Sequence, residues 1–362
     1  MKNKSKFLIF SLSAALAAPL GLQAEPVSVA TDPVGYVTTV VPNQSDLNLG
    51  ATLHKESLYV GTVEDVDLNK VYLQLDGIDA MSSSSYLIIK SGDDNGKWFE
   101  ILNQDLDGSG DFVEFDVDME SLDLSVGSQV EIRRFWTLES LFPDGSFPVS
   151  QNVGSPSAQV LFRPASSSGL NVASSLAYFY HDGSSGFLDE GWYRSGTLAV
   201  SNDVAISPEE SITIRNGLSE AIEISVSGSV KIKPSSMNIV SLDLSDNDNY
   251  VYNPFPVDVN INDLNLIESG VFEQSPNVGS PVDRLLVYSQ SPSGINEAPS
   301  QVLFYHDGSS GFLDEGWYQA GTLVSADSTT ISAGGGLIIR KSSGEDEIMS
   351  WNLKPIDELT TN

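Results

Sequence analysis

A phrase of fifteen residues, FYHDGSSGFLDEGWY, occurs twice in this chain without a change, at Phe179–Tyr193 and at Phe304–Tyr318. Sliding the sequence against itself by 125 positions extends the match without a gap, so that Gly145–Gly217 aligns with Gly270–Ser342. An internal repeat of this length is typical of tandem structural units. We therefore expect two copies of one fold.

The two copies have diverged unevenly. Across Phe179–Leu198, 18 of 20 positions are identical in the second copy, but across Ala199–Arg215 only 4 of 17 are. A strand tolerates substitution while its alternation persists, whereas a long loop held by its own side chains needs many positions together. The phrase was either kept by constraint or re-copied, and we expect it to be a structural joint.

In this joint, FYHDG ends one strand, DGSSG leaves the sheet through residues that tolerate positive φ, and the chain re-enters a strand at Gly191. Phe187 and Leu188 are expected to fold back as a small apolar plug. The tryptophans should be buried and the histidines should hydrogen-bond within their own loops: Trp192, Trp317, His181 and His306.

Strand patterns cover most of the chain. Apolar and polar residues alternate in VEFDVD (Val113–Asp118), SITIR (Ser211–Arg215), AIEISVSGSVKIK (Ala221–Lys233) and VDVNIND (Val257–Asp263). Short helices are favoured only at LESLF (Leu138–Phe142) and INDLNLIESG (Ile261–Gly270). The pattern predicts an all-β fold of tandem small β-sandwich or barrel-like modules after a signal-peptide helix.

Four segments are expected along the chain. They are a signal peptide at 1–24, an N-terminal β domain at 25–134, a first repeat module at 135–255 with a hairpin-like extension at Ala221–Tyr252, and a second repeat module at 256–362. The N-terminus supports the first, because basic MKNKSK precedes apolar FLIFSLSAALAA and a cleavage site after Ala24. No later stretch reaches the roughly 18 apolar residues of a spanning helix. We expect a periplasmic, cell-surface or extracellular protein.

Composition and charge restrict how the fold can be stabilised and which partners the protein can bind. The chain has no cysteine, so it must hold together without disulfides. Without the three lysines of the signal peptide, 15 basic residues face 49 acidic ones, a formal net charge of −34. Such a surface repels nucleic-acid phosphates and anionic membranes, and it attracts cations. We expect no nucleic acid and no membrane insertion, while a glycan or another surface partner and the oligomeric state stay open.

Four further phrases resemble one family. ATDPVGYVTT (Ala30–Thr39), GKWFEI (Gly96–Ile101), RRFWTLESLF (Arg133–Phe142) and NPFPVDVNIND (Asn253–Asp263) are similar to landmarks of an uncharacterised family of exported verrucomicrobial proteins. The family has no assigned activity, cofactor or catalytic residues. The resemblance implies export and β architecture, and it transfers no functional residue.

The segment DLDGSGDFVEFD has the spacing of a calcium-binding loop, with Gly110 at the position of its sharp turn. The oxygen ligands would be Asp105, Asp107, Ser109, Asp111 and Asp116. A second register would run from Asn103 to Glu114. Both flanks favour strands instead of the helices of an EF-hand, so an acidic hairpin turn is the alternative. Calcium is the only cofactor that the sequence suggests.

The duplicated phrase carries groups that could bind a metal or perform acid–base chemistry. They are His181, Asp182, Asp189, Glu190 and Trp192, repeated as His306, Asp307, Asp314, Glu315 and Trp317. Asp189 and Glu190 are neighbours and would point to opposite faces of a strand, whereas a glycosidase needs two facing carboxyls about 5–9 Å apart. The tryptophans could stack on sugars, but such aromatics are more often core.

These observations favour an exported, non-enzymatic β-rich protein with a structural or cell-surface role. A carbohydrate-binding or calcium-binding module is the first alternative, and a secreted hydrolase is the second.

The hypothesis that this segment binds calcium can be tested on the purified mature protein. Added Ca²⁺ should raise the melting temperature, and Asp107→Ala should abolish the gain because it removes a ligand. Calorimetry measures both, and no binding at millimolar Ca²⁺ would end this reading.

Overall fold

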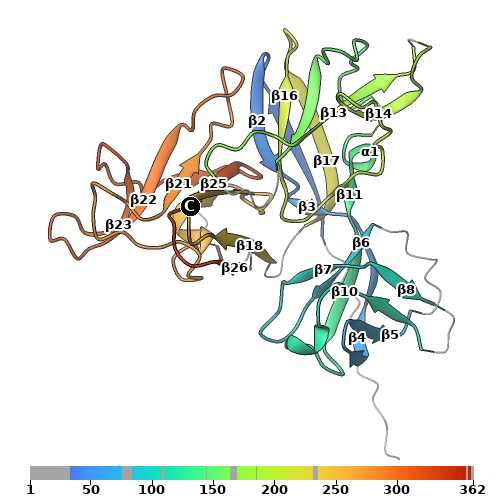
Figure 1. Ribbon diagram of the computed structural model, residues 1–362, viewed down its shortest axis with the longest axis horizontal. Helices are drawn as coiled ribbons and strands as arrows, with labels where there is room; N and C mark the ends of the chain where they lie inside the picture. Colours follow the sequence, from blue (N-terminus) through green and yellow to red (C-terminus); the bar gives the residue numbers. More distant parts are fainter. Residues whose placement is uncertain are drawn as a thin grey trace, which may run out of the picture. The chain divides into compact units, whose positions relative to one another are not determined.

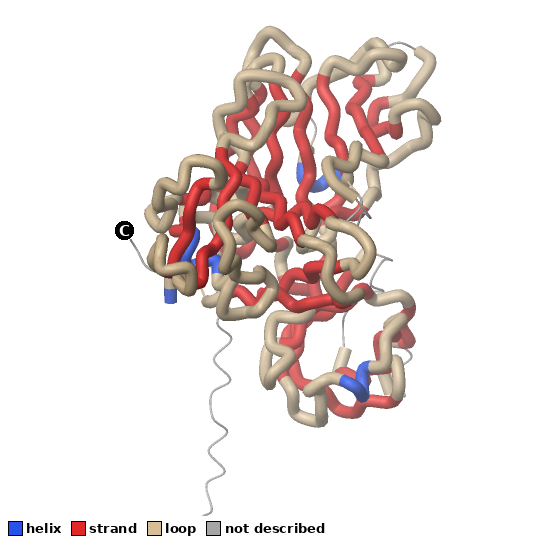
Figure 2. Tube along the Cα trace, turned by 60° about the vertical axis from the view of Figure 1, so that its left-hand side comes forward, coloured by secondary structure: helices blue, strands red, loops and turns tan. Residues whose placement is uncertain are grey.

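The computed structural model describes residues 33–75, 84–106, 110–143, 145–163, 169–184, 186–230, 235–355 and 358–359. Strands dominate these residues, which confirms the all-β prediction (Figures 1 and 2). The helical elements are short: η1 (Met119–Ser121), α1 (Leu138–Leu141) and η2 (Ile261–Leu264). The helix α1 confirms the one expected at Leu138–Phe142, whereas η2 is a 3-10 turn over only the first four residues of the segment expected at Ile261–Gly270. The predicted signal peptide lies outside the described residues.

A seven-stranded antiparallel sheet forms the part that we call domain N, residues 57–134. Its order is β7-β6-β10-β4-β5-β9-β8. The strands are β4 (Ser57–Asp67), β5 (Lys70–Leu73), β6 (Ser85–Ile89), β7 (Trp98–Glu100), β8 (Asn103–Asp105), β9 (Phe112–Glu114) and β10 (Gln129–Arg134). Val63, Leu87 and Ile132 belong to its own apolar core.

The first repeat, which we call module A, combines strands from both sides of domain N. They are β1 (Val34–Val41), β2 (Ser45–Gly50), β3 (Leu53–His54), β11 (Trp136–Thr137), β12 (Ala158–Phe162), β13 (Leu176–Asp182), β14 (Glu190–Arg194), β15 (Ala205–Ile206), β16 (Ser211–Asn216) and β17 (Ile222–Val230). The main sheet has the order β14-β13-β12-β16-β2, beside the smaller sheets β1-β17-β3 and β11-β15. Figure 1 shows β2 beside β16.

The second repeat, module B, has the same strand order. It contains β18 (Ser235–Ser241), β19 (Asn247–Tyr252), β20 (Val259–Asn260), β21 (Arg284–Val287), β22 (Gln301–Asp307), β23 (Glu315–Gln319), β24 (Thr330–Ile331), β25 (Gly336–Lys341) and β26 (Glu347–Leu353). Its sheets are β23-β22-β21-β25-β19, β18-β26 and β20-β24. Strand for strand, β19 therefore corresponds to β2, and β18 to β1.

The strand pairings divide the chain differently from the boundaries expected near Arg134 and Phe255. Because β1 and β2 pair with β17 and β16, domain N is an insertion within module A. The hairpin-like extension at Ala221–Tyr252 is wrong, since β17 ends module A and β18 begins module B by pairing with β26. Alternation reveals a strand but not its partner. The inserted domain also moves β1 and β2 out of the 125-residue offset.

Two predicted strands are also shorter than expected. In VEFDVD, β9 ends at Glu114 and a bend follows. In VDVNIND, only β20 is extended, and the chain then turns into η2. The Asn260 side chain accepts a hydrogen bond from the Asn262 amide and so caps this turn.

The two modules repeat unusual backbone conformations at matching positions. Leu198 and Leu323 have φ of 57° and 58°, and Asn171 and Asn296 have 53° and 56°. A leucine in the left-handed region is rare, because its side chain crowds the backbone there. The duplication is therefore one of local conformation as well as of sequence.

Module A carries an Asp–Arg pair that a loop of module B completes. Arg215 donates to both carboxylate oxygens of Asp46, at 2.9 and 2.7 Å, and to the Asn296 side chain at 2.9 Å. The Asn296 amide donates back to Asp46, and the Asp46 amide donates to the Gly294 carbonyl. We call this set the first clamp.

The second clamp has the same bonds with the modules exchanged. Arg340 donates to both oxygens of Asp248, at 2.7 and 3.0 Å, and to the Asn171 side chain at 3.0 Å. The Asn171 amide donates to Asp248, and the Asp248 amide donates to the Gly169 carbonyl. Each module thus contributes one Asp–Arg pair to one clamp and one loop to the other, which is the reciprocity of a two-fold interface within a single chain.

The two clamps predict that loss of Arg340 destabilises the protein more than loss of Arg215. The Asp248 side chain is completely buried, whereas the Asp46 side chain is 9% exposed. Arg340→Met should cost about 3–5 kcal/mol of unfolding free energy, because it strands a buried carboxylate. Arg215→Met should cost less. Urea titration measures both, and costs below about 1 kcal/mol for both would show that the clamps do not hold the modules.

Candidate functional site

The duplicated phrase forms the hairpins β13–β14 and β22–β23. Trp192 and Trp317 are 0% and 1% exposed, at matching places in the two cores. Each packs on the matching phenylalanine, Phe147 or Phe272, with ring centroids 4.9 and 5.0 Å apart. Trp192 also packs on Phe142, at 5.6 Å. The expected burial of both tryptophans is confirmed, so neither presents a face to a sugar.

The two histidines are fully buried and bonded within their own loops, as predicted. Nδ1 of His181 accepts from the Gly183 amide, and Nδ1 of His306 accepts from the Gly308 amide, both at 2.9 Å. An accepting Nδ1 carries no proton, so it is not available to donate one. In the second copy, Nε2 lies 3.0 Å from the Ser310 hydroxyl.

A glycine before each tryptophan is required by geometry. Gly191 and Gly316 have φ of 149° and 150°, and an added Cβ would lie 2.9 Å from an oxygen of Asn202 or Asp327. That oxygen accepts from the tryptophan amide, at 2.7 and 2.8 Å. Close backbone packing therefore explains why a glycine precedes the tryptophan in both copies.

The carboxylates of the phrase bond locally on its outer side. Asp182 accepts from the Ser184 amide and hydroxyl, which lowers the pKa of Asp182, and Asp307 behaves alike. Glu190 accepts from the Tyr180 hydroxyl at 2.7 Å. Asp189, Asp314 and Glu315 are exposed, and Glu315 accepts from Tyr305.

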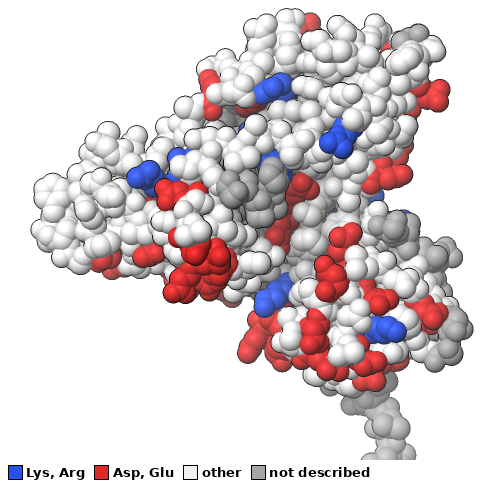
Figure 3. Space-filling view, in the orientation of Figure 1, with Lys and Arg blue, Asp and Glu red and all other residues white. Residues whose placement is uncertain are grey.

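These acids do not assemble a metal centre. Within the parts that the structure describes, no group of three or more His, Cys, Asp or Glu side chains could hold a metal ion. Figure 3 shows acidic side chains scattered over one face, with fewer basic ones.

The expected apolar plug is wrong. Phe187 and Phe312 are 72% and 70% exposed. Trp192 and Phe147 already fill the interior beneath the hairpin, and side-chain hydrogen bonds to the backbone hold the loop instead. We call residues 182–190 and 307–315 the twin loops; each presents a phenylalanine at the same place.

The acidic segment of domain N is a hairpin between β8 and β9, with Asp105 opposite Phe112. Asp107 and Ser109 lie outside the described residues, so the calcium site stays a prediction, as do the roles of Asp111 and Asp116. In the second register, Asn103 donates to Glu114 across the strands at 3.2 Å.

Three buried acids are neutralised by basic partners. Glu131 pairs with Lys90 at 3.1 Å and with Arg133, Asp283 pairs with Lys341, and Asp248 belongs to the second clamp. Burial opposes the ionisation of Glu131, but Lys90 and Arg133 outweigh it and lower the pKa of its carboxyl.

Sequence reasoning missed Glu210. Burial raises the pKa of its carboxyl to about 7. The hydrogen bond that it accepts from the Ser207 amide lowers the pKa, but by less. Gly335 stands at the matching position of module B. This difference between the two copies was the sequence signal that could have singled out Glu210.

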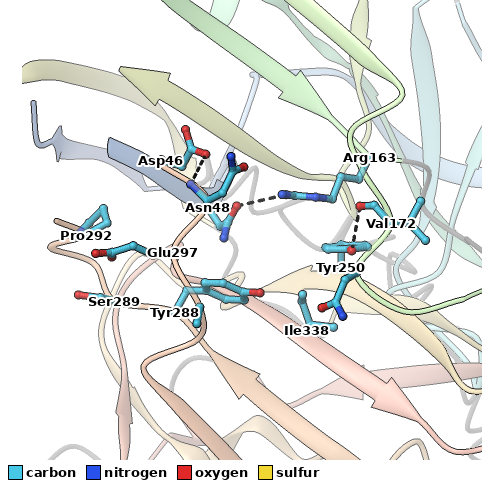
Figure 4. Close-up of a pocket in the computed structure, with 13 residues that line it drawn as sticks. Asp46, Asn48, Arg163, Val172, Tyr250, Tyr288, Ser289, Pro292, Glu297 and Ile338 are labelled. Carbon is cyan, nitrogen blue, oxygen red and sulfur yellow. Dashed lines mark hydrogen bonds between the residues drawn. The ribbon is translucent and has the colours of Figure 1, made fainter. Parts of the chain in front are cut away.

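Sequence reasoning also missed a pocket between the clamps, with a volume of about 140 Å³. It is lined by Asn48 of β2, Arg163 after β12, Tyr250 of β19 and Tyr288 after β21, together with Glu297. Figure 4 shows Arg163 reaching toward Asn48, with Tyr250 beneath it and Tyr288 across from Asn48. Residues from both modules therefore build this site.

Comparison with known proteins finds no matching family model, no similar curated protein and no similar solved structure. The family resemblance therefore stays a prediction. Within the described residues, no helix has the length and apolar character to cross a membrane.

The twin loops predict a contrast between two neighbouring aromatics. Trp192→Ala should cost about 3–5 kcal/mol, because it empties a buried site. Phe187→Ala should change stability by less than about 0.5 kcal/mol, since its side chain is exposed. Chemical denaturation of the two variants checks this, and equal costs would contradict the assignment.

The raised pKa of Glu210 predicts that the Glu210→Gln variant is more stable than the wild type, but only at high pH. Its raised pKa means that folding loses stability as pH rises from about 4.5 to about 7. Glu210→Gln should be neutral at pH 4 and stabilising on the order of 1–3 kcal/mol at pH 8. Urea titrations at both pH values measure it; an equal effect at the two would refute the shift.

Proposed function

We propose that the chain is an exported, non-enzymatic β protein with a structural or cell-surface role, and that its twin loops make the contacts. The observation that carries this is the identity of two exposed phenylalanines, Phe187 and Phe312. Packing explains why a buried tryptophan is kept, but it gives no reason to keep an exposed aromatic.

Buried positions nearby show the contrast. Tyr178 and Phe162 of module A are replaced by Leu303 and Val287 in module B, although all four are buried. The copies thus changed residues inside the core while they kept an exposed ring. An exposed aromatic at a loop tip is the kind of residue that binding surfaces use.

The surroundings indicate the partner's charge. The exposed carboxylates of Asp189 and Glu190 follow Phe187 closely in the chain, and Asp314 and Glu315 follow Phe312 in the same way. Such a loop repels anions, so the proposed partner is a neutral or cationic surface. Two identical loops in one chain bind a repetitive surface more tightly than either alone when both can engage.

The non-enzymatic part of the proposal rests on the same geometry. The histidines of the phrase are buried and bonded within their loops, and Glu131, Asp248 and Asp283 are paired with bases. Export rests on the N-terminal signal pattern alone. The carbohydrate alternative cannot use Trp192 and Trp317, because both are buried.

Co-sedimentation with isolated cell envelopes tests the loops. The wild-type protein should sediment, and the double variant Phe187→Ser/Phe312→Ser should lose binding by at least about tenfold, with each single variant intermediate. Val200→Ser/Val324→Ser is the matched control, because it also removes two exposed apolar side chains. Retained binding by the phenylalanine double variant, or an equal loss in the control, would refute the contact role.

A further inference from the structure

At the pocket between the clamps, the two modules differ in the chemistry of the side chains that they contribute. The clamps repeat the same residue types, but three repeat-related pairs at or beside the pocket differ in chemistry: Arg163 and Tyr288, Asn48 and Tyr250, Thr213 and Ile338. Module A contributes the polar member of each pair, and module B the aromatic or apolar member.

The polar side is held firmly. Arg163 donates to the Asn48 oxygen at 3.2 Å and to the Thr213 hydroxyl at 2.5 Å, and Thr213 donates to Asn48 at 2.5 Å. The Arg163 guanidinium lies 4.9 Å over the Tyr250 ring, whose hydroxyl donates to the Val172 carbonyl. These contacts fix Arg163, Asn48 and Tyr250 before any ligand arrives, which reduces the entropic cost of binding.

Several polar groups of the lining have no hydrogen-bond partner among the residues that the structure describes. The side-chain oxygens of Asn48, Asn171 and Asn296 accept hydrogen bonds from arginines, but among the described residues their amide nitrogens donate none. The Tyr288 hydroxyl likewise has no partner there. Glu297 uses one carboxylate oxygen for Ser293 and leaves the other open. The pocket therefore offers several donors, one acceptor and an aromatic ring.

We propose that this pocket binds one ring of a neutral saccharide, a function separate from that of the twin loops. Each sugar hydroxyl both donates and accepts, so it can serve the amide nitrogens and the Glu297 oxygen together. The C–H face of a sugar ring can lie on Tyr288. Arg163 and Glu297 balance in charge and Asp46 is paired with Arg215, so a neutral ligand fits.

The size agrees with a single ring. A volume of about 140 Å³ is below the roughly 300 Å³ at which sites for drug-sized ligands begin. The pocket would therefore hold one unit, either as a monosaccharide or as a residue of a longer chain whose remainder stays in solvent.

The test uses the mature protein and methyl glycosides of glucose, galactose, mannose and N-acetylglucosamine, with galacturonate as the anionic comparison. Saturation-transfer NMR detects binding, and titration gives the affinity. At least one neutral glycoside should saturate the wild-type protein, and Tyr288→Leu should weaken it by at least about tenfold. Phe312→Ser, which changes a twin loop, should bind as the wild type does.

Three results would overturn the proposal: no neutral glycoside saturating by about 50 mM, binding of galacturonate alone, or unchanged affinity in Tyr288→Leu. If circular dichroism shows that Tyr288→Leu is unfolded, Glu297→Gln takes its place with the same tenfold criterion. Because Phe312→Ser separates the two sites, a failure here leaves the envelope-binding result standing.

Discussion

The reciprocal Asp–Arg clamps are the interaction on which the arrangement of the two modules depends. Asp248 is fully buried, and a buried carboxylate is tolerated only when its partners are complete. Those partners come from Arg340 in its own module and from the Asn171 loop in the other. Neither module can satisfy its Asp–Arg pair alone, and the pocket between the clamps exists because both loops cross over.

An inserted domain is compatible with this architecture because it enters at a connection between strands. Module B passes from β19 to β20 in a short link, whereas module A places domain N between β2 and β11. Insertion at a surface connection leaves the flanking pairings intact, and longer connections cost little additional entropy. Domain N also has its own apolar core, so it does not draw on that of module A.

The duplicated phrase combines two kinds of constraint. Trp192, His181 and Gly191 are determined by packing, by a hydrogen bond within the loop and by a backbone conformation that a Cβ would obstruct. The Phe187 side chain is 72% exposed, so burial in the core does not explain why it is kept. The phrase is therefore a hairpin held by packing and local hydrogen bonds, and its exposed edge is the surface that we propose for contacts.

The sequence by itself predicted the all-β class, the repeat, the short helix α1 and the burial of Trp192 and Trp317, because these follow from alternation, local capping and the size of an apolar ring. It misjudged Phe187, since a hydrophobic residue in a loop can be packed or exposed. It also missed the pairing of β1 with β17 and the pocket of Arg163 and Tyr288. Tertiary structure decided these because strand partners and clamp loops are brought together across the inserted domain, and no local pattern records which distant segments meet.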